Sequence, residues 1–273
     1  MENTLHEKIR KEAFNIRKNI IMTVVNNGEG HAGPALSCAD ILATVYFGIK
    51  NPQDKFILSA GHKCLALYGT LVQFGTVDKS ILDTYNKLGS PIPGHPDMYK
   101  LPGVDFSTGS LGHGLGVACG FAKAAKMQGS DMRCFVVMGD GEQAEGTVWE
   151  AAALAAHHKL DNIIAFVDQN HLQVSGQTSD VMSMEVLEEK YKSFGWNAVK
   201  LNGHDIPQLY DAICQAPYSQ GKPTVFICDT IKGKGLPFAE NNARYHHWDP
   251  DENEKIEAVK ALKAQAEKEG WEL

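Results

Sequence analysis

The chain has 273 residues, of which 43% are hydrophobic and 22% charged, and its formal net charge is −7. This composition is ordinary for a soluble globular protein, and the acidic balance argues against nucleic acid as a partner, because nucleic acid requires a basic face. No segment is apolar for the roughly twenty residues of a membrane span, and the first residues lack the blocks of a signal peptide. We therefore expect a cytoplasmic protein that binds neither membrane nor nucleic acid, with its six scattered cysteines reduced.

Helical and strand patterns alternate along the chain. Residues 4–26 carry apolar side chains at helical spacing, and Ser37-Cys38-Ala39-Asp40 is typical of a cap that opens a second helix reaching Phe47. Strands are predicted over residues 56–58, 133–138, 162–168, 196–201 and 224–229. Further helices are predicted over residues 63–74, 111–127, 146–158, 184–193 and 206–216.

This alternation predicts a single α/β domain over residues 1–273, with a mostly parallel sheet covered by helices on both faces. Residues 237–250 are expected to be irregular. A charged amphipathic helix is expected at about residues 251–268, near the end of the chain.

The run Gly139-Asp140-Gly141 follows one predicted strand, and Asn170 follows the next strand, thirty positions after Asp140. Both side chains should therefore lie at the carboxyl edge of the sheet, where open α/β sheets bind ligands. A carboxylate and an amide oxygen suit Mg²⁺ or Ca²⁺, and the glycines leave backbone amides open to a phosphate. The pattern indicates a site for a metal-bound diphosphate.

The same run resembles the signature of thiamine diphosphate enzymes, and further segments resemble transketolase, in the order that family shows. The resemblance covers about residues 10 to 248. The matching segments are Gly30-His31-Ala32-Gly33-Pro34, Leu58-Ser59-Ala60-Gly61-His62, Pro93-Gly94-His95-Pro96 and Thr108-Gly109-Ser110-Leu111-Gly112-His113-Gly114.

The resemblance implies a thiamine diphosphate-binding fold with thiamine diphosphate and Mg²⁺ as cofactors, Ca²⁺ or Mn²⁺ being able to substitute. It assigns Asp140, Asn170 and the Leu172 carbonyl to the metal, and Gly141, Asn170, His62 and His246 to the metal-bound diphosphate. It also assigns Gly109 and Leu111 to the aminopyrimidine, and Val174 to the ring system.

Four histidines are candidate catalytic residues. His31, His62 and His95 lie in glycine-containing turns, where an imidazole can face a cleft and exchange protons near physiological pH. The resemblance implies that they hydrogen-bond the hydroxyl and carbonyl oxygens of a ketose donor. It implies a fourth active-site histidine near the diphosphate, for which His246 fits the spacing better than His247.

Ordinary transketolases are more than twice as long, so the resemblance also implies a missing part. This chain corresponds to the N-terminal subunit of a split transketolase and needs a C-terminal partner, with two copies of each chain in an expected heterotetramer. The enzyme would transfer a two-carbon glycolaldehyde unit from a ketose to an aldose. Donors with phosphate, sulfonate or branched skeletons all stay open, because the groups that select the distal end of the sugar lie largely in the missing part.

Other classes of protein share parts of these patterns. A dinucleotide-binding dehydrogenase is disfavoured because the glycine cluster at Gly112, Gly114 and Gly116 has Val117 where Gly-x-Gly-x-x-Gly requires a third glycine. The α subunit of a 2-oxo acid dehydrogenase and a deoxyxylulose-phosphate synthase share the metal signature. A non-catalytic assembly subunit is a further alternative.

Overall fold

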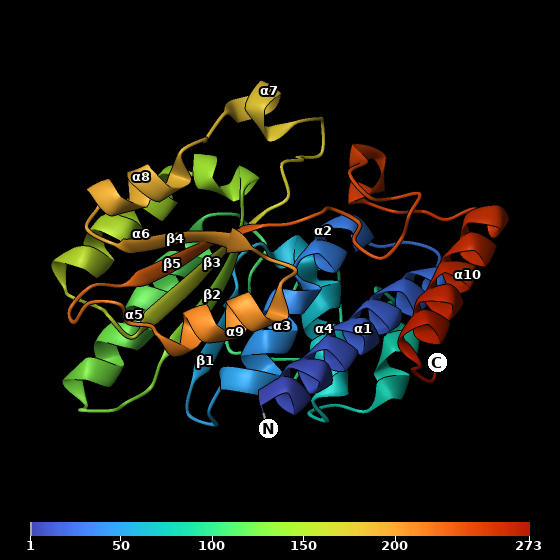
Figure 1. Ribbon diagram of the computed structural model, residues 1–273, viewed down its shortest axis with the longest axis horizontal. Helices are drawn as coiled ribbons and strands as arrows, with labels where there is room; N and C mark the ends of the chain where they lie inside the picture. The colour runs from blue at the N-terminus through green and yellow to red at the C-terminus, as the bar shows by residue number, and fades with distance from the viewer. Residues whose placement is uncertain (1) are drawn as a thin grey trace.

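A five-stranded sheet lies at the centre of the molecule (Figure 1). The computed structural model describes residues 2–273, and the side chains from Thr4 onward. All neighbouring strands pair in parallel, in the order β1-β2-β3-β5-β4, which confirms the predicted α/β fold. The strands are β1 (Lys55–Leu58), β2 (Cys134–Gly139), β3 (Ile163–Gln169), β4 (Asn197–Asn202) and β5 (Thr224–Asp229).

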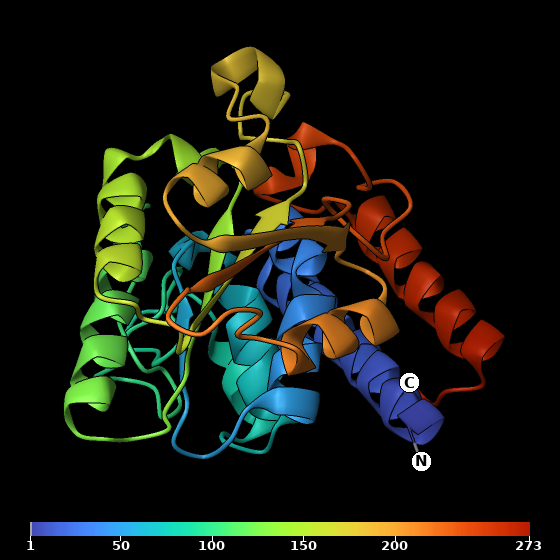
Figure 2. The same ribbon diagram turned by 60° about the vertical axis from the view of Figure 1, so that its left-hand side comes forward.

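Both faces of the sheet are buried, because successive side chains of a strand point to opposite sides. Phe135 and Val137 of β2 join one apolar core, whereas Val136 and Met138 join the other. The first core packs against α1 (Glu2–Asn27), α3 (Ala39–Thr44), α4 (Cys64–Gln73) and α9 (Ile206–Cys214). The second core packs against α5 (His113–Met127), α6 (Gly146–His157) and α8 (Leu187–Ser193), which stand on the opposite side in Figure 2.

The predicted helices and strands all appear, with ends displaced by a few residues. The structure adds short elements that the pattern did not predict, because each is only a turn or two long. They are α2 (Ala32–Ser37), η2 (Gly61–Lys63), η3 (Lys79–Thr84), η4 (Gly141–Ala144), α7 (Thr178–Met182) and η5 (Ala243–His246). The predicted second helix is present as α3 followed by one π-helical turn, η1 (Val45–Ile49).

The predicted cap at Ser37 is wrong. Ser37 ends α2 rather than opening a helix, and the following helix has Cys38 at its N-cap without a side-chain cap bond. The Ser37 hydroxyl donates instead to the buried Asp168 carboxylate at 2.6 Å, 131 positions away. A tertiary hydrogen bond has replaced the local one.

The six cysteines are free, as expected, and five of them are buried. Among the helices that the structure describes, none combines the length and the apolar character needed to cross a membrane.

Residues 230–250 form a strap that runs from the end of β5 to the last helix, α10 (Glu252–Glu269). A pair of backbone hydrogen bonds joins Gly30 and Trp248 in an antiparallel bridge. The Trp248 indole N–H and the Tyr245 hydroxyl both donate to Glu254 in the first turn of α10. The strap is therefore fastened both to the segment before α2 and to α10.

The N-terminus of α10 carries a capping box. The Asp251 side chain accepts from the Glu254 amide, and the Glu254 side chain accepts from the Asp251 amide. Asp251→Ala leaves the Glu254 amide without its partner, so the free energy of unfolding should fall by about 1 kcal/mol. Chemical denaturation measures this change. The matched control is Asp249→Ala at a neighbouring exposed position, and an equal loss in both variants would contradict the capping role.

Candidate active site

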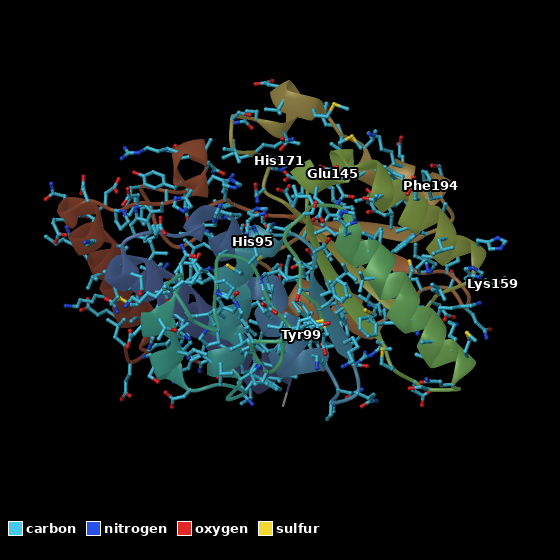
Figure 3. The ribbon with its side chains drawn as sticks, turned by 180° about the vertical axis from the view of Figure 1, so that it is seen from behind. His95, Tyr99, Glu145, Lys159, His171 and Phe194 are labelled. Carbon is cyan, nitrogen blue, oxygen red and sulfur yellow. The ribbon has the colours of Figure 1, made fainter. Side chains whose placement is uncertain are left out.

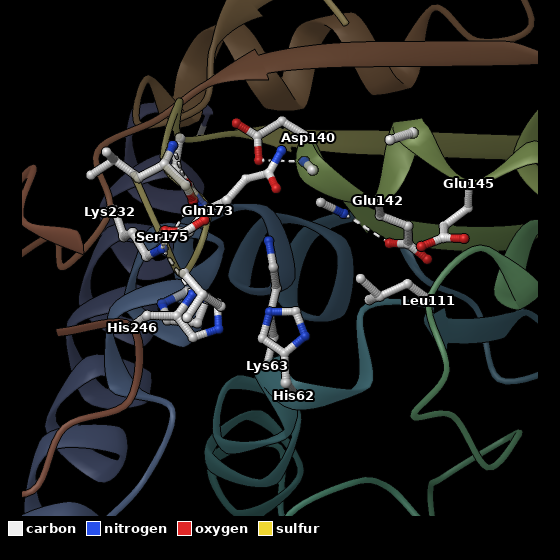
Figure 4. Close-up of a pocket in the computed structure, with 17 residues that line it drawn as sticks. His62, Lys63, Leu111, Asp140, Glu142, Glu145, Gln173, Ser175, Lys232 and His246 are labelled. Atoms are coloured by element: carbon white, nitrogen blue, oxygen red, sulfur yellow. Dashed lines mark hydrogen bonds between the residues drawn. The ribbon is translucent and has the colours of Figure 1, made fainter. Parts of the chain in front are cut away.

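A cavity of about 340 Å³ opens at the carboxyl edge of the sheet (Figure 4). Its walls come from segments that follow four different strands: the turn after β1, the glycine run after β2, residues 170–175 after β3 and the loop after β5. In Figure 4, Lys232 and His246 lie on one side, Leu111 and Glu142 on the other, with His62 and Lys63 between them.

Asp140 and Asn170 emerge next to each other, as the strand pattern predicted. Parallel register pairs Gly139 with Asp168, so the following residues leave the sheet at the same edge. The Asp140 carboxylate accepts from the amides of Gly141 (2.8 Å) and His171 (2.7 Å). The Asn170 side-chain oxygen accepts from the amide of Leu172, the residue after His171, at 3.2 Å. Both oxygens therefore hold the same turn.

Lys232 reaches the cavity from the loop after β5. Its Nζ donates to the carbonyl oxygens of Leu172 (2.9 Å) and Gln173 (3.3 Å), and to His246 Nδ1 at 2.9 Å. Burial, and then the charge of Lys63, lowers the pKa of Lys232 to about 8. The sequence did not predict that Lys232 lines the cavity, because the run Ile231-Lys232-Gly233-Lys234-Gly235 is typical of a flexible basic turn.

A buried ion pair lies at the base of the cavity. Lys63 and Asp168 are 1% and 0% exposed, and their side chains are in direct contact. Burial alone would lower the pKa of Lys63, but the Asp168 carboxylate raises it overall. The lysine therefore stays charged where it lines the cavity, with its Nζ close to the Gly139 backbone. The sequence does not indicate that Lys63 pairs with Asp168, because the two residues lie 105 positions apart.

Glu142 fastens the walls to each other. Its carboxylate accepts from the Ser59 hydroxyl and from the amides of Gly112 (2.8 Å) and Gly139 (2.9 Å). Burial raises its pKa, which these hydrogen bonds partly offset. This carboxylate is thus a hydrogen-bond acceptor that joins three segments. Glu145, by contrast, is exposed at the rim of the cavity.

Three of the four candidate catalytic histidines form one cluster. The His31 ring lies 5.7 Å from the His62 ring and 5.5 Å from the His246 ring, and His62 and His246 stack at 5.1 Å, all between centroids. The bridge between Gly30 and Trp248 explains this proximity, because it brings the neighbours of those two residues together. His246 lines the cavity, whereas His247 packs against His31 at 4.7 Å without lining it.

Of the four candidate catalytic histidines, His62 and His246 line the cavity, whereas His31 and His95 do not. His95 is exposed (Figure 3) and lies against Gly109, whose added Cβ would be 3.5 Å from the His95 ring. Gly109 and His113 line a separate shallow depression at the start of α5. Leu111 and Val174 thus line the same cavity as Asp140 and Asn170, whereas Gly109 and His95 lie at its margin.

The three clustered histidines are neutral at physiological pH. Burial, followed by positive neighbours, lowers the pKa of His31 to about 4, of His62 to about 2 and of His246 to about 3. A neutral imidazole both donates and accepts a hydrogen bond. The positive charge of the cavity therefore comes from its lysines.

The cavity fits a metal-bound diphosphate by its donor chemistry. Asp140, Asn170 and the Leu172 carbonyl offer hard oxygen atoms at one turn, and two ammonium groups can neutralise an anion. Gln173 Nε2 is buried in the wall without a hydrogen-bond partner, which suits an acceptor on a bound ligand. Within the described residues, no cluster of three or more His, Cys, Asp or Glu side chains could hold a metal alone. A metal here would take part of its shell from the ligand.

Comparison with known proteins agrees with this chemistry. Residues 9–271 match the family model described as transketolase, thiamine diphosphate binding domain. The chain is 37% identical to a subunit of the apulose-4-phosphate transketolase of Phocaeicola vulgatus, over 96% of both proteins. It is 38% identical to a 6-deoxy-6-sulfo-D-fructose transketolase subunit of a Clostridium species, over 96% of this chain and 97% of that protein.

Solved structures show the same fold in longer chains. Transketolase from Campylobacter jejuni superposes with a TM-score of 0.85 at 31% identity, over 97% of this chain but only 43% of that chain. The present chain therefore spans less than half the length of that solved transketolase.

Fold and cavity thus define a thiamine diphosphate-binding domain, and the chain belongs to the transketolase family. Its match to almost the full length of separate transketolase subunits confirms the prediction of an N-terminal subunit of a split transketolase, which makes it part of a transferase. The 2-oxo acid dehydrogenase, deoxyxylulose-phosphate synthase and assembly-subunit alternatives are not supported.

The lowered pKa of His31 makes stability depend on pH. The unfolded chain takes up a proton on this imidazole near pH 6.5, whereas the folded chain does so only near pH 4. The contribution of His31 to the free energy of unfolding is therefore present above pH 6.5 and is lost as the pH falls toward 4. His31→Gln should flatten this part of the curve in chemical denaturation at a series of pH values. An unchanged slope would show that the ring takes up its proton near the ordinary pKa.

Proposed function

We propose that residues 1–273 form the single thiamine diphosphate-binding domain of a two-chain transketolase, which moves a two-carbon unit from a modified ketose to an aldose. The observation that carries this proposal is the turn at which Asp140 and Asn170 accept from the amides of His171 and Leu172 beside the cavity. The free cysteines favour a reducing compartment, so we place the enzyme in the cytoplasm.

The metal would be Mg²⁺, for which Ca²⁺ or Mn²⁺ can substitute, held by Asp140, Asn170 and the Leu172 carbonyl. The last of these oxygens accepts from Lys232 in this structure, which puts a cation beside the proposed metal position. Gly141 and His62 would contact the diphosphate, with Lys232 and Lys63 supplying positive charge. The rings of the coenzyme would be held by Leu111 and Val174 of the cavity wall, together with Gly109. Thiamine diphosphate supplies the electron sink that breaks the bond beside the ketose carbonyl.

The protein would bind and orient the sugar through histidines. His31, His62 and His246 are neutral, so they can donate to a carbonyl or hydroxyl oxygen and accept from a hydroxyl. His31 Nδ1 is buried without a partner, which leaves one ring atom for a ligand. His95 stands at the margin next to Gly109, where it would meet the donor rather than the diphosphate.

A C-terminal transketolase subunit would complete the site. Val174 lines the cavity although it is 69% exposed, so none of the described residues covers the outer side of this wall. Gly116 and Gly120 of α5 are exposed, and an added Cβ at either position would meet no atom within 4 Å. Such a smooth helix face admits the close approach of another chain. We propose a heterotetramer with two copies of each subunit.

The donor would be a ketose that differs from an ordinary sugar phosphate. This proposal follows from the relatives, whose names specify apulose 4-phosphate and a sulfonated ketose. Because Lys63 and Lys232 are assigned to the coenzyme diphosphate, the C-terminal subunit would supply most of the groups that hold the distal phosphate or sulfonate of the donor.

Transfer activity should appear only when the chain is combined with a matching C-terminal subunit. The assay offers apulose 4-phosphate, 6-deoxy-6-sulfo-D-fructose or fructose 6-phosphate as donor with an aldose phosphate, and measures the lengthened ketose by mass spectrometry. His95→Ala should lower the transfer rate at least about tenfold while the affinity for thiamine diphosphate stays unchanged, because His95 lies outside the cavity. Transfer at the wild-type rate in that variant would exclude the proposed role of His95.

Replacing Asp140 should weaken binding of the metal and the coenzyme together. In the assembled enzyme, Asp140→Asn removes the charged oxygen ligand, and calorimetry with Mg²⁺ and thiamine diphosphate should show affinity reduced by a factor of about 100. Asp180→Asn, in the neighbouring α7, is the matched control and should bind normally. Equal affinity in the two variants would place the metal elsewhere.

A further inference from the structure

His204 lies outside the cavity, in the loop between β4 and α9, yet it contacts the loop that carries Lys232. Its Nε2 accepts from the Ile231 amide at 2.9 Å. Its Nδ1 lies 2.7 Å from the Asp40 carboxylate of α3.

The two hydrogen bonds fix the tautomer of the ring. Because the Ile231 amide donates to Nε2, that nitrogen carries no proton, and the ring proton must be on Nδ1, which donates to Asp40. Asp40 stays ionised: burial would raise its pKa, but the Arg17 guanidinium and the bond from His204 lower it to about 2. Arg17 holds both carboxylate oxygens. Arg17, Asp40, His204 and the Ile231 amide thus form one chain of hydrogen bonds from α1 to the loop after β5.

The loop at the end of this chain is tightly positioned. Ile231 directly precedes Lys232, whose ammonium contacts Leu172 and His246 in the cavity. An added Cβ on Gly203, next to His204, would come within 2.4 Å of the Thr230 side chain, so the two loops touch without spare room. The acceptor for the Ile231 amide therefore lies one residue from Lys232, in a loop without spare room.

We propose that His204 is a positioning residue for cofactor binding: it accepts the Ile231 amide and thereby holds the Lys232 ammonium at the diphosphate position. This inference rests on the proposed function, since it presumes that the cavity binds thiamine diphosphate. It assigns the residue a role without contact to cofactor or sugar.

Two substitutions, His204→Asn and His204→Gln, test separately the hydrogen bonds made by Nδ1 and by Nε2 of the His204 ring. Glutamine can place an acceptor near the position of Nε2, whereas asparagine reaches only the position of Nδ1. In the assembled enzyme, His204→Asn should raise the Kd for thiamine diphosphate with Mg²⁺ about tenfold, and His204→Gln should restore it to within about twofold of wild type. The KM for the aldose should be unchanged in both, because His204 touches neither the cavity nor its histidines. His157→Asn, at the exposed end of α6, is the control and should bind as wild type.

Either of two results would overturn the inference: His204→Asn binds thiamine diphosphate with wild-type affinity, or His204→Gln binds it as weakly as His204→Asn does. If the asparagine variant does not fold, hydrogen exchange on the wild-type holoenzyme decides: the Ile231 amide should be as protected as the amides of β5, and free exchange would overturn the proposal. Failure of the wild-type enzyme to bind thiamine diphosphate would instead overturn the proposed function, and with it this role.

Discussion

One buried carboxylate joins the parts of the cavity. Asp168, at the end of β3, accepts from the Ser37 and Thr230 hydroxyls, the Asn170 side-chain amide and the Lys63 ammonium. These partners come from α2, the turn after β1, the turn after β3 and the loop after β5. An unpartnered charge at this depth costs about 3 to 5 kcal/mol, so the ionised carboxylate requires all four segments to stay close. The positions of the cavity walls follow from this requirement.

The electrostatics of the cavity divide two tasks between two residue types. Burial keeps the clustered imidazoles neutral, whereas the lysines remain cationic because each lies beside carboxylate or carbonyl oxygens. Lys63 and Lys232 therefore supply the positive charge of the cavity, while the neutral histidines can both donate and accept hydrogen bonds. Neither residue type could perform both tasks near neutral pH.

The sequence predicted what depends on periodicity and on local glycine runs. The strands, the long helices and the adjacency of Asp140 and Asn170 all follow from patterns within a few residues or from the parallel register. The functions of Ser37, Glu142 and Lys63 could not be predicted, because their partners lie far along the chain, at Asp168 and Ser59 among others. His204 was missed for the same reason: only the folded chain shows that a loop histidine accepts the Ile231 amide.

The strap sets an order of events during synthesis. Trp248 pairs with Gly30, and His246, two residues before Trp248, lines the cavity, so segments far apart along the chain must meet before the cavity is complete. The sheet needs nothing beyond Asp229, and it can form while the ribosome is still translating the strap. The cavity wall that Lys232 and His246 form can therefore be completed only after translation has passed Trp248. Completion of the cavity is in this sense a late step in the maturation of the chain.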